Sequence, residues 1–540
     1  MKKRVGFCSV FVIIPLIFSC AKKEKTTVNP YIEVNPFNVE FVIEEDNIEN
    51  NFVLTNYDGE VINGDDGVYT ITSGGVYTAT GKLDYGQIYV DAPYEEVEVD
   101  LDGVSITNNS YPPIYANDCL ELVIKVKRGS INYIYDTRKT DYSDSNDEDA
   151  GSSAIYASNG NIKVNGNGKI LIESRNNSGI SSSDNVTVKN CTMMIKAKNN
   201  GIKGSDKVTI EEHPVLSIYA GNDGIKTTNS KMGEKSQHGN IYILGGNIIV
   251  NSDGDAIHAA YGVEFGQSVD EEGVIYRPIV DLYTNIYSNF SATTFEISER
   301  NSYDGMQECA LNSSKGIKAN ELVNIVTGDV FIYANDDGIQ VKQNTLDDGS
   351  TSSGNMTVYG GNILIKSDDD GIHTDGSFKI FDGEVTIGWS HEGIESDSID
   401  VTGGETKVYA IEDGLNADTS ILISGGRVDV SVPATGSCDG IDSNGTLTIT
   451  GGTTIVRGPN AEMSSPIDCV GLAKISDGNL IIVGFVAYYL SYENLTKNTS
   501  KKISGKGEHI IFIGGEQITY NNLYDYKGVT TVFSKKTVVF

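Results

Sequence analysis

Cysteine, proline, tryptophan and cationic residues are all scarce in this sequence. Its seven cysteines are widely spaced and include no Cys-x-x-Cys pair, which argues against a disulfide framework or a zinc site. The 41 lysines and arginines face 74 acidic residues, so nucleic acid and anionic lipid surfaces are poor partners for a formal charge of −33. Segments of helical periodicity are absent, as are the His-Glu-x-x-His, Gly-x-Ser-x-Gly and P-loop motifs.

Glycine, by contrast, is abundant and recurs in a fixed pattern. Triplets of an acid, a glycine and an aliphatic residue end at Ile372, Ile394, Leu415 and Ile441, with a period of 21 to 26 residues. Such a period indicates stacked supersecondary units. Short alternating runs such as Val385–Ile387 stand between the triplets, and the consensus of leucine-rich repeats does not occur. The pattern predicts an all-β parallel β-helix, a solenoid whose aliphatic residues form an inward-pointing ladder.

The repeats are flanked by segments of different composition. Lys2, Lys3 and Arg4 precede an apolar run that is short for a membrane span and ends at Cys20. This resembles the lipobox of bacterial lipoproteins, so Cys20 is the predicted lipidation site; a secretory signal with an incidental cysteine is the alternative. The expected segments are a lipoprotein signal peptide (1–20), a polar tether (21–38), a β-rich N-terminal cap (39–96), the β-helix (97–470, with an insertion at about 261–313) and a C-terminal β segment (471–540).

Acidic residues stand two positions before the ladder residue in most repeats. Equivalent positions of a parallel β-helix stack about 4.8 Å apart. Unit charges about 5 Å apart repel by roughly 1 kcal/mol in water and by about 3 kcal/mol at an effective dielectric of 20. A bound cation removes this cost, and carboxylate oxygens suit Ca²⁺. Ordinary turn chemistry of Asp before Gly remains the alternative. The predicted calcium ligands are Asp223, Asp255, Asp337, Asp370, Glu392, Asp413 and Asp439.

The residue directly after the ladder position changes along the chain. It is lysine or histidine in the earlier repeats and acidic or amidic in most of the later ones. If these side chains point outward, they form a face graded from basic to acidic, whose lysines could bind the carboxylates of uronic acids. Solvated corner residues are the alternative. The predicted ligand-binding residues are Lys203, Lys226, Lys318 and His373.

Several motifs carry a specific resemblance. The runs NNGIKGSDKVTI, NDGIKTTN, GGNIIVNSDGDAIHAA, SDDDGIHTDG and HEGIESDSIDVTGG resemble the bacterial carbohydrate-binding domain family of right-handed parallel β-helices, over about Val97 to Pro466. That family takes its name from a cellulose- and acid-sugar-binding surface protein. The resemblance implies a secreted, calcium-binding protein similar in shape to pectate lyases, with metal-binding acids at the corners of its coils.

The sequence leaves three functions to weigh. The favoured one is a calcium-binding, non-catalytic protein that holds an acidic or cellulosic polysaccharide, acts as a monomer and meets the membrane only through its lipid anchor. A calcium-dependent polysaccharide lyase is the second, with Lys203 and Lys226 as candidate bases, because Arg427 and Arg457 have no obvious acidic partner. The third is an adhesive surface protein without a glycan ligand. The expected location is extracytoplasmic, on the surface of a bacterial cell.

Overall fold

The computed structural model describes residues 48–138, 153–230, 232–233, 236–284, 313–345, 349 and 351–540. These residues form strands, turns and irregular segments, with no helix among them. Within this part of the chain, nothing helical is therefore long and apolar enough to cross a membrane. The signal peptide, Cys20 and the tether lie outside the described residues and stay predictions.

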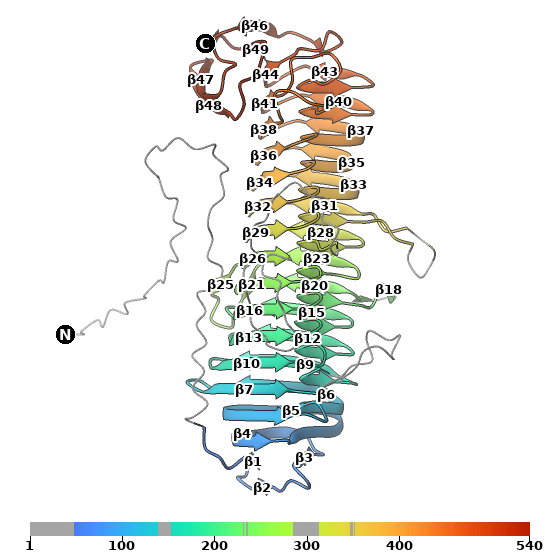
Figure 1. Ribbon diagram of the computed structural model, residues 1–540, viewed down its shortest axis with the longest axis vertical. Coiled ribbons are helices and arrows are strands. Elements are labelled where there is room, and N and C mark those ends of the chain that lie inside the picture. Colours follow the sequence, from blue (N-terminus) through green and yellow to red (C-terminus); the bar gives the residue numbers. More distant parts are fainter. Residues whose placement is uncertain are drawn as a thin grey trace, which may run out of the picture. The chain divides into compact units, whose positions relative to one another are not determined.

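Most strands belong to one long sheet of 43 strands (Figure 1). Between its two ends, each strand pairs in parallel with the equivalent strands of the repeats before and after it. β10 (Lys169–Ser174), for example, pairs with β7 (Ile131–Asp136) and with β13 (Thr192–Ala197). The chain thus contributes three strands to each repeat, one to each of three parallel stacks. We call one such set of three strands a coil. The all-β, repeating and parallel character predicted from the sequence is confirmed.

The first stack begins each coil with the ladder residue. Beyond the long strands β5 (Gln87–Asn108) and β6 (Ile114–Val126), its members are β8 (Ile155–Ala157), β11 (Ile180–Ser182), β14 (Ile202–Gly204), β17 (Ile225–Thr227), β22 (Ile257–His258), β27 (Ile317–Ala319), β30 (Ile339–Val341), β39 (Ile441–Ser443), β42 (Ile467–Cys469) and the first halves of β33 (Ile372–Ile380), β35 (Ile394–Val401) and β37 (Leu415–Ile423).

The other two stacks complete the coils. The second contains the later halves of β33, β35 and β37 with β9 (Asn161–Gly166), β12 (Asn185–Lys189), β15 (Lys207–Glu211), β20 (Asn240–Ile243), β23 (Gly262–Phe265), β28 (Leu322–Ile325), β31 (Asn355–Val358), β40 (Thr446–Ile449) and β43 (Ala473–Ile475). The third continues from β7, β10 and β13 with β16 (Val215–Ala220), β21 (Asn247–Ser252), β26 (Ile279–Thr284), β29 (Asp329–Ala334), β32 (Asn362–Ser367), β34 (Glu384–Ser390), β36 (Glu405–Ala410), β38 (Arg427–Ser431), β41 (Thr453–Arg457) and β44 (Asn479–Gly484).

The ladder residues lie in register at the centre of the core. From Ile88 to Ile467 each pairs with the ladder residue of the next coil, and each is at most 1% exposed. The glycine before the ladder residue is needed for close approach, because a Cβ on Gly371 would stand 2.6 Å from the carbonyl oxygen of Gly393. At the Gly-Gly corners, the second glycine has a positive φ, such as 87° at Gly361, which disfavours any other residue.

Both ends of the stack are made by antiparallel strands. At the N-terminal end, β1 (Val53–Asn56) pairs antiparallel with β2 (Val61–Ile62) and β4 (Gly75–Asp84), whereas β3 (Val68–Ile71) pairs in parallel with β5. β5 runs across residues 96 and 97, where the cap was expected to end. At the C-terminal end, β49 (Val529–Ser534) pairs antiparallel with β44. The remaining C-terminal strands are β45 (Ser491–Tyr492), β46 (Thr496–Ser500), β47 (Gly507–Ile513), β48 (Glu516–Asn522) and β50 (Val538–Val539).

The expected insertion at 261–313 is too long. Its first part contains β23 and β26, which pair with strands of the coils before and after them. The insertion was inferred from the long interval between the ladder residues Ile257 and Ile317. These strands lie within that interval, because the chain completes the coil as well as leaving the stack between the two ladder residues. A hairpin of β24 (Ser268–Val269) and β25 (Ile275–Tyr276) connects them, and residues 285–312 lie outside the described part. A second hairpin consists of β18 (Met232–Gly233) and β19 (Ser236–Gln237).

Candidate functional site

The residues that follow the ladder positions form a continuous column, which we call the corner column. In each strand of the first stack, this residue lies between two buried residues, and most members are half-exposed. The alternation of a strand turns its side chain outward. In chain order the corner column comprises Tyr89, Tyr115, Tyr156, Ser181, Lys203, Lys226, His258, Lys318, Gln340, His373, Glu395, Asn416, Asp442 and Asp468.

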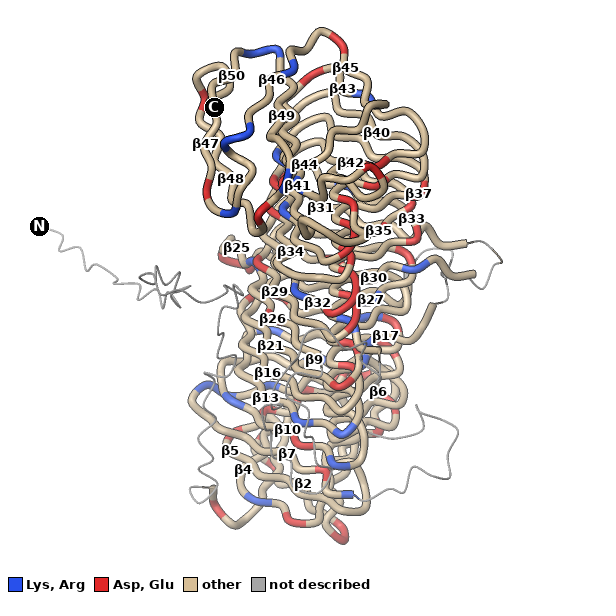
Figure 2. Tube along the Cα trace, turned by 45° about the horizontal axis from the view of Figure 1, so that its top comes forward, with Lys and Arg blue, Asp and Glu red and all other residues tan. Residues whose placement is uncertain are grey.

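The predicted calcium ligands form a second column beside the corner column. Figure 2 shows the acidic residues following one another through the coils near β27, β30 and β35. One carboxylate oxygen in most of these residues accepts the backbone N–H of the same position in the next coil. Asp223 Oδ1 accepts from the Asp255 N–H at 2.9 Å, and Asp413 Oδ1 from the Asp439 N–H at 2.7 Å. The backbone of the next coil, and not the local turn, therefore occupies one oxygen of each such carboxylate.

In the middle of the column, the second oxygen contacts a cation. Asp223 Oδ2 lies 3.1 Å from both Lys226 Nζ and His258 Nδ1. Asp255 Oδ2 lies 3.2 Å from His258 Nδ1 and 3.7 Å from Lys318 Nζ. Predicted metal ligands and predicted sugar ligands thus contact each other. Burial alone would raise the pKa of Asp223, but the hydrogen bond with His258 and the charge of Lys226 lower it below its ordinary value.

In the coils that follow, the acidic side chains of the column are paired with a different lysine and with an amide. Lys315 occupies a position where most coils have an acid, and its Nζ lies 2.5 Å from Asp336 Oδ2 and 3.7 Å from Asp337 Oδ2. The Gln340 amide donates to Asp337 Oδ2. Burial raises the pKa of Asp337 to about 6, although the charge of Lys315 opposes the shift. Asp337 is therefore satisfied without a metal ion.

The column continues through the histidine-containing coils. His373 Nδ1 lies 3.0 Å from Asp370 Oδ2 and 3.1 Å from Glu395 Oε2. Hydrogen bonds with these carboxylates raise the pKa of His373 to about 11, whereas burial is the main cause that raises the pKa of Asp370. Glu392 accepts from the Asn416 amide at 3.0 Å, and burial raises its pKa.

The C-terminal end of the column is acidic without compensation. Among the described residues, no lysine, arginine or histidine lies within 4.0 Å of the carboxylates of Asp413, Asp439, Asp442 or Asp468. Burial, with repulsion from neighbouring aspartates, raises the pKa of Asp439 to about 7 and that of Asp442 to about 6. The Tyr489 hydroxyl donates to Asp468 Oδ1 at 2.6 Å. Oxygen ligands in an uncompensated negative field suit Ca²⁺. These four aspartates are not, however, among the described groups whose ligand atoms all lie within 4.8 Å of one another, so a shared ion would have to draw them closer together.

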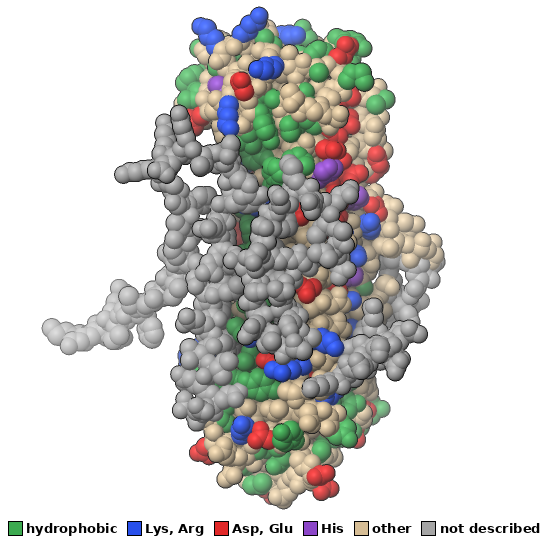
Figure 3. Space-filling view, viewed as in Figure 1, with side chains coloured by type: hydrophobic (Ala, Val, Ile, Leu, Met, Phe, Trp, Pro, Cys, Tyr) green, Lys and Arg blue, Asp and Glu red, His purple; other side chains and the backbone are tan. Residues whose placement is uncertain are grey.

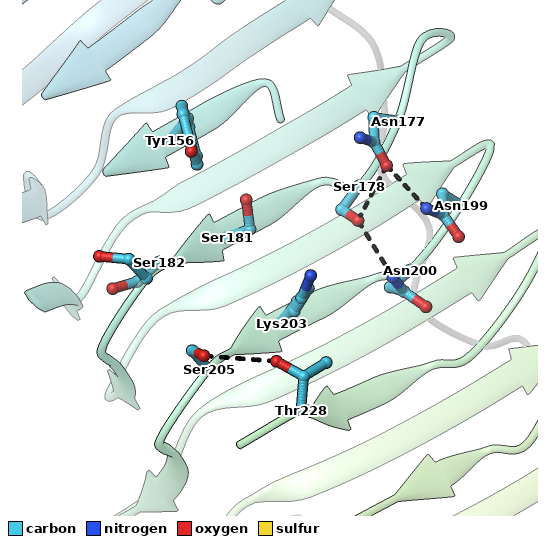
Figure 4. A pocket seen from close by; sticks show the side chains of 11 residues that line it. Tyr156, Asn177, Ser178, Ser181, Ser182, Asn199, Asn200, Lys203, Ser205 and Thr228 are labelled. Atoms are coloured by element: carbon cyan, nitrogen blue, oxygen red, sulfur yellow. Dashed lines mark hydrogen bonds between the residues drawn. The ribbon is translucent and has the colours of Figure 1, made fainter. Parts of the chain in front are cut away.

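The other end of the corner column carries aromatic rings above a polar hollow. Tyr89 and Tyr115 meet edge to face, and Tyr115 stacks on Tyr156 with ring centroids 5.5 Å apart. Figure 4 shows Tyr156, Ser181 and Lys203 projecting from successive strands into a hollow of about 190 Å³. Hydroxyls and amides line the rest of it: Asn177, Ser178, Ser182, Ser183, Asn199, Asn200, Ser205 and Thr228.

Sequence analysis did not assign these tyrosines to the site. Tyr89, Tyr115 and Tyr156 each follow an isoleucine of the ladder, so the same rule that found Lys203 would have found them. Figure 3 shows lysine, histidine and acidic side chains gathered along one edge of the molecule, with acidic side chains prevailing towards the C-terminal coils. The graded face expected from the sequence therefore begins with aromatic residues.

The two corner arginines have an acidic partner after all. Arg427 Nη2 lies 2.9 Å from Asp429 Oδ2, and Arg457 Nη2 contacts Asp429 Oδ1. Arg457 is 0% exposed beneath the C-terminal strands, where the Arg427 side chain also donates to the carbonyl of Thr519. The partner was missed because Asp429 stands beside Arg457 only through the pairing of β38 with β41. Arg457 cannot reach a ligand.

Comparison with known proteins places this geometry in a family. A curated carbohydrate-binding domain-containing protein from Acetivibrio thermocellus is 33% identical over 128 residues, which make up 24% of this chain and 44% of that protein. The chain thus spans less than half of that relative's length. A solved structure described as a polysaccharide lyase-like protein from C. thermocellum, a gadolinium derivative, is 30% identical, with a TM-score of 0.35 over 41% of this chain and 86% of that one.

A family model described as carbohydrate-binding domain-containing protein matches residues 65–353 and 341–485, which include every coil of the corner column. The resemblance seen in the sequence motifs is confirmed. The chain belongs to the family of carbohydrate-binding domain-containing proteins.

Proposed function

We propose that this protein is a right-handed parallel β-helix, anchored to the surface of a bacterial cell, that binds calcium and holds an acidic or cellulosic polysaccharide without cleaving it. The observation that carries the proposal is the corner column, in a chain whose family is one of carbohydrate-binding proteins. Its outward residues repeat at the spacing of paired strands, about 4.8 Å. A linear glycan lying along the column would therefore meet a new side chain with each coil.

The N-terminal half of the corner column suits sugar rings. Tyr115 and Tyr156 stack face to face, so their exposed ring edges offer apolar contact to the C–H surface of a pyranose, and their hydroxyls offer hydrogen bonds. Lys203, Lys226 and Lys318 follow in the next coils and could bind uronate carboxylates. Lys226 and Lys318 would share their charge between the ligand and the acids that they already contact. A cellulosic chain would depend more on the rings and hydroxyls than on the lysines.

Calcium would be held at the C-terminal end of the column, by Asp413, Asp439, Asp442 and Asp468. Burial and repulsion from neighbouring acids raise the pKa values of Asp413, Asp439 and Asp442, which supports this choice over the lysine-paired acids. A bound calcium ion would remove the repulsion between neighbouring coils and could bridge to a uronate carboxylate. The other predicted ligands, Asp223, Asp255, Asp337 and Asp370, already contact a cation or an amide.

Lipidation of Cys20 and the tether at 21–38 would attach the β-helix to the membrane and leave it monomeric on the extracytoplasmic side. This part of the proposal rests on the sequence alone.

A polysaccharide lyase is the second candidate. It would need Lys203 or Lys226 as the base that removes the proton next to a uronate carboxylate, because Arg427 and Arg457 are engaged by Asp429. Lys226 Nζ lies 3.1 Å from Asp223 Oδ2 and would have to leave this contact to act on a substrate. A purely adhesive role, without a glycan ligand, leaves the polar hollow beside Tyr156 without a function.

Calorimetric titration separates these candidates. The chain without residues 1–20 would be titrated with polygalacturonate and with cello-oligosaccharides, with calcium and after EDTA, while the ultraviolet absorbance of unsaturated uronate is followed. Binding without growth of absorbance is the result expected of a carbohydrate-binding protein. Growth of absorbance would establish a lyase. Absence of binding to both glycans would sink the proposal for these ligands.

A further inference from the structure

One coil brings together a histidine and two carboxylates in an arrangement that differs from a simple ion pair. His373 Nδ1 faces Asp370 Oδ2 at 3.0 Å and Glu395 Oε2 at 3.1 Å. The three atoms lie within 4.8 Å of one another, the mutual distance expected of ligands that share one small ion. Asp370 and His373 come from one coil and Glu395 from the next, where it pairs with His373 in register.

The imidazole is held in one orientation from behind. Its other nitrogen, Nε2, lies 3.4 Å from Asp375 Oδ1. Asp375 is itself fixed, because its Oδ2 accepts the backbone N–H of Gln343 at 2.8 Å. A carboxylate behind a histidine, on the side away from the metal ion, is the usual outer support of metal-ligating imidazoles, since it fixes the tautomer and the ring orientation.

The equivalent histidine three coils earlier provides an internal comparison. His258 Nδ1 also faces two carboxylates, Asp223 at 3.1 Å and Asp255 at 3.2 Å. There, however, Lys226 Nζ lies 3.1 Å from Asp223 Oδ2, and Lys318 Nζ lies 3.7 Å from Asp255 Oδ2. Both carboxylates of this coil already have a lysine, so a further dication would be repelled.

The coil of His373 has no such lysine. The residues that stand before and after His373 in the corner column are Gln340 and Glu395, where His258 has Lys226 and Lys318. Among the described residues, the only cationic side chain within 4.0 Å of Asp370 or Glu395 is His373 itself. With a neutral imidazole the three groups carry a charge of −2, which matches a divalent ion.

We propose that Asp370, His373 and Glu395 bind a divalent transition-metal ion of the class of Zn²⁺. An imidazole nitrogen with two carboxylate oxygens suits such an ion better than Ca²⁺, which takes oxygen ligands. The His373 and Glu395 side chains are 26% and 41% exposed, so water can complete the coordination shell and the ion can enter from solvent. The competitor for the site is the proton on Nδ1, which the ion must displace.

Titration of the untagged full chain with ZnCl₂ by calorimetry tests this site, with Co²⁺ absorption as a second measurement. We expect one Zn²⁺ site, and a visible Co²⁺ spectrum that differs from that of aqueous Co²⁺ and returns to it in His373→Asn. His373→Asn should weaken Zn²⁺ binding at least 100-fold. Asp375→Asn should weaken it about 10-fold, the usual loss when an outer support is removed. His258→Asn is the matched control and should change the affinity less than 2-fold.

Three results would overturn the proposal. Absence of Zn²⁺ binding to the wild-type chain would show that the cluster is only an ion pair. Retained binding in His373→Asn, or a loss of binding in His258→Asn, would place the ion elsewhere. Thermal unfolding and a far-ultraviolet spectrum of each variant distinguish a lost ligand from a lost fold, and His373→Gln provides a second variant should His373→Asn fail to fold.

Discussion

Replacement of Asp223 tests whether the corner acids are structural first and ligands second. Asp223 is 4% exposed. Its Oδ1 accepts the N–H of Asp255, and its Oδ2 contacts Lys226 and His258. Asp223→Ala would leave a buried N–H without an acceptor, and Lys226 and His258 without their shared partner. Asp223→Asn would keep the acceptor and lose only the charge, as Asn200 already does one coil earlier, where it accepts the N–H of Asp223 at 3.2 Å.

The two variants should differ in cost. A buried donor without an acceptor costs about 1–3 kcal/mol. The contacts to Lys226 and His258, whose side chains are 19% and 22% exposed, contribute about 0.5–1 kcal/mol together after solvent screening. We therefore expect Asp223→Ala to destabilise its coil by about 2–4 kcal/mol and Asp223→Asn by less than about 1 kcal/mol.

Hydrogen exchange is the appropriate assay, because stacked repeats that contact mainly their neighbours can open locally rather than together. The amides of residues 255–257 should exchange roughly 30- to 1,000-fold faster in Asp223→Ala, since each 1.4 kcal/mol is a factor of ten. Equal acceleration in both variants would refute the argument, because the charge and not the acceptor would then matter. The pKa of Asp223 is lowered in the folded chain. The stability that its charge contributes is therefore present above the unfolded pKa of about 3.9 and is lost as the pH falls through the lower folded pKa.

Three further predictions concern the ligand, the metal and the pH. Tyr156→Ala should weaken glycan binding about 3- to 10-fold in calorimetry, because one stacked ring is lost. Tyr359→Ala removes an exposed ring that stacks on Phe381 away from the corner column, and it should leave the affinity unchanged. Equal effects of the two variants would show that the corner column does not bind the glycan. Calcium at about 100 times its Kd should raise the free energy of unfolding by about 2.7 kcal/mol. Asp439→Asn should abolish this gain, whereas Asp223→Asn should retain it. The opposite result would show that the ion binds at the lysine-paired acids. Burial raises the pKa of Asp281 to about 6, so stability should fall as the pH rises from about 4 to 6; Asp281→Asn should raise the thermal midpoint at pH 8 and leave it unchanged below pH 4, and a gain at both pH values would point to a cause other than charge.

The repeating part of the structure could be predicted because one rule generates it. A ladder residue such as Ile372 must be aliphatic in every coil, and the glycine before it must admit the carbonyl of the next coil, so both leave a periodic signal. The direction of the corner column follows from the alternation of a strand, and the graded order of Lys203 and Glu395 could therefore be anticipated.

The contacts that decide the site could not be predicted, because they depend on register between coils. Nothing in the sequence around Asp223 indicates that one oxygen bonds the next coil while the other is shared by Lys226 and His258. The pairing of Arg457 with Asp429 joins residues one coil apart in the third stack. The insertion was misplaced for a related reason, since β23 and β26 carry no ladder residue and were invisible to the count.

Covalent labelling of lysines tests the central claim, that the corner column is the surface on which the glycan lies. The chain would be acetylated with and without saturating polygalacturonate, and the modified lysines quantified by mass spectrometry. The account predicts that the glycan protects Lys203, Lys226 and Lys318 from acetylation. Lys125 and Lys379, whose side chains are 42% exposed in other strand positions, should be labelled equally in both samples. Protection of Lys125 or Lys379 in place of the column lysines would contradict it.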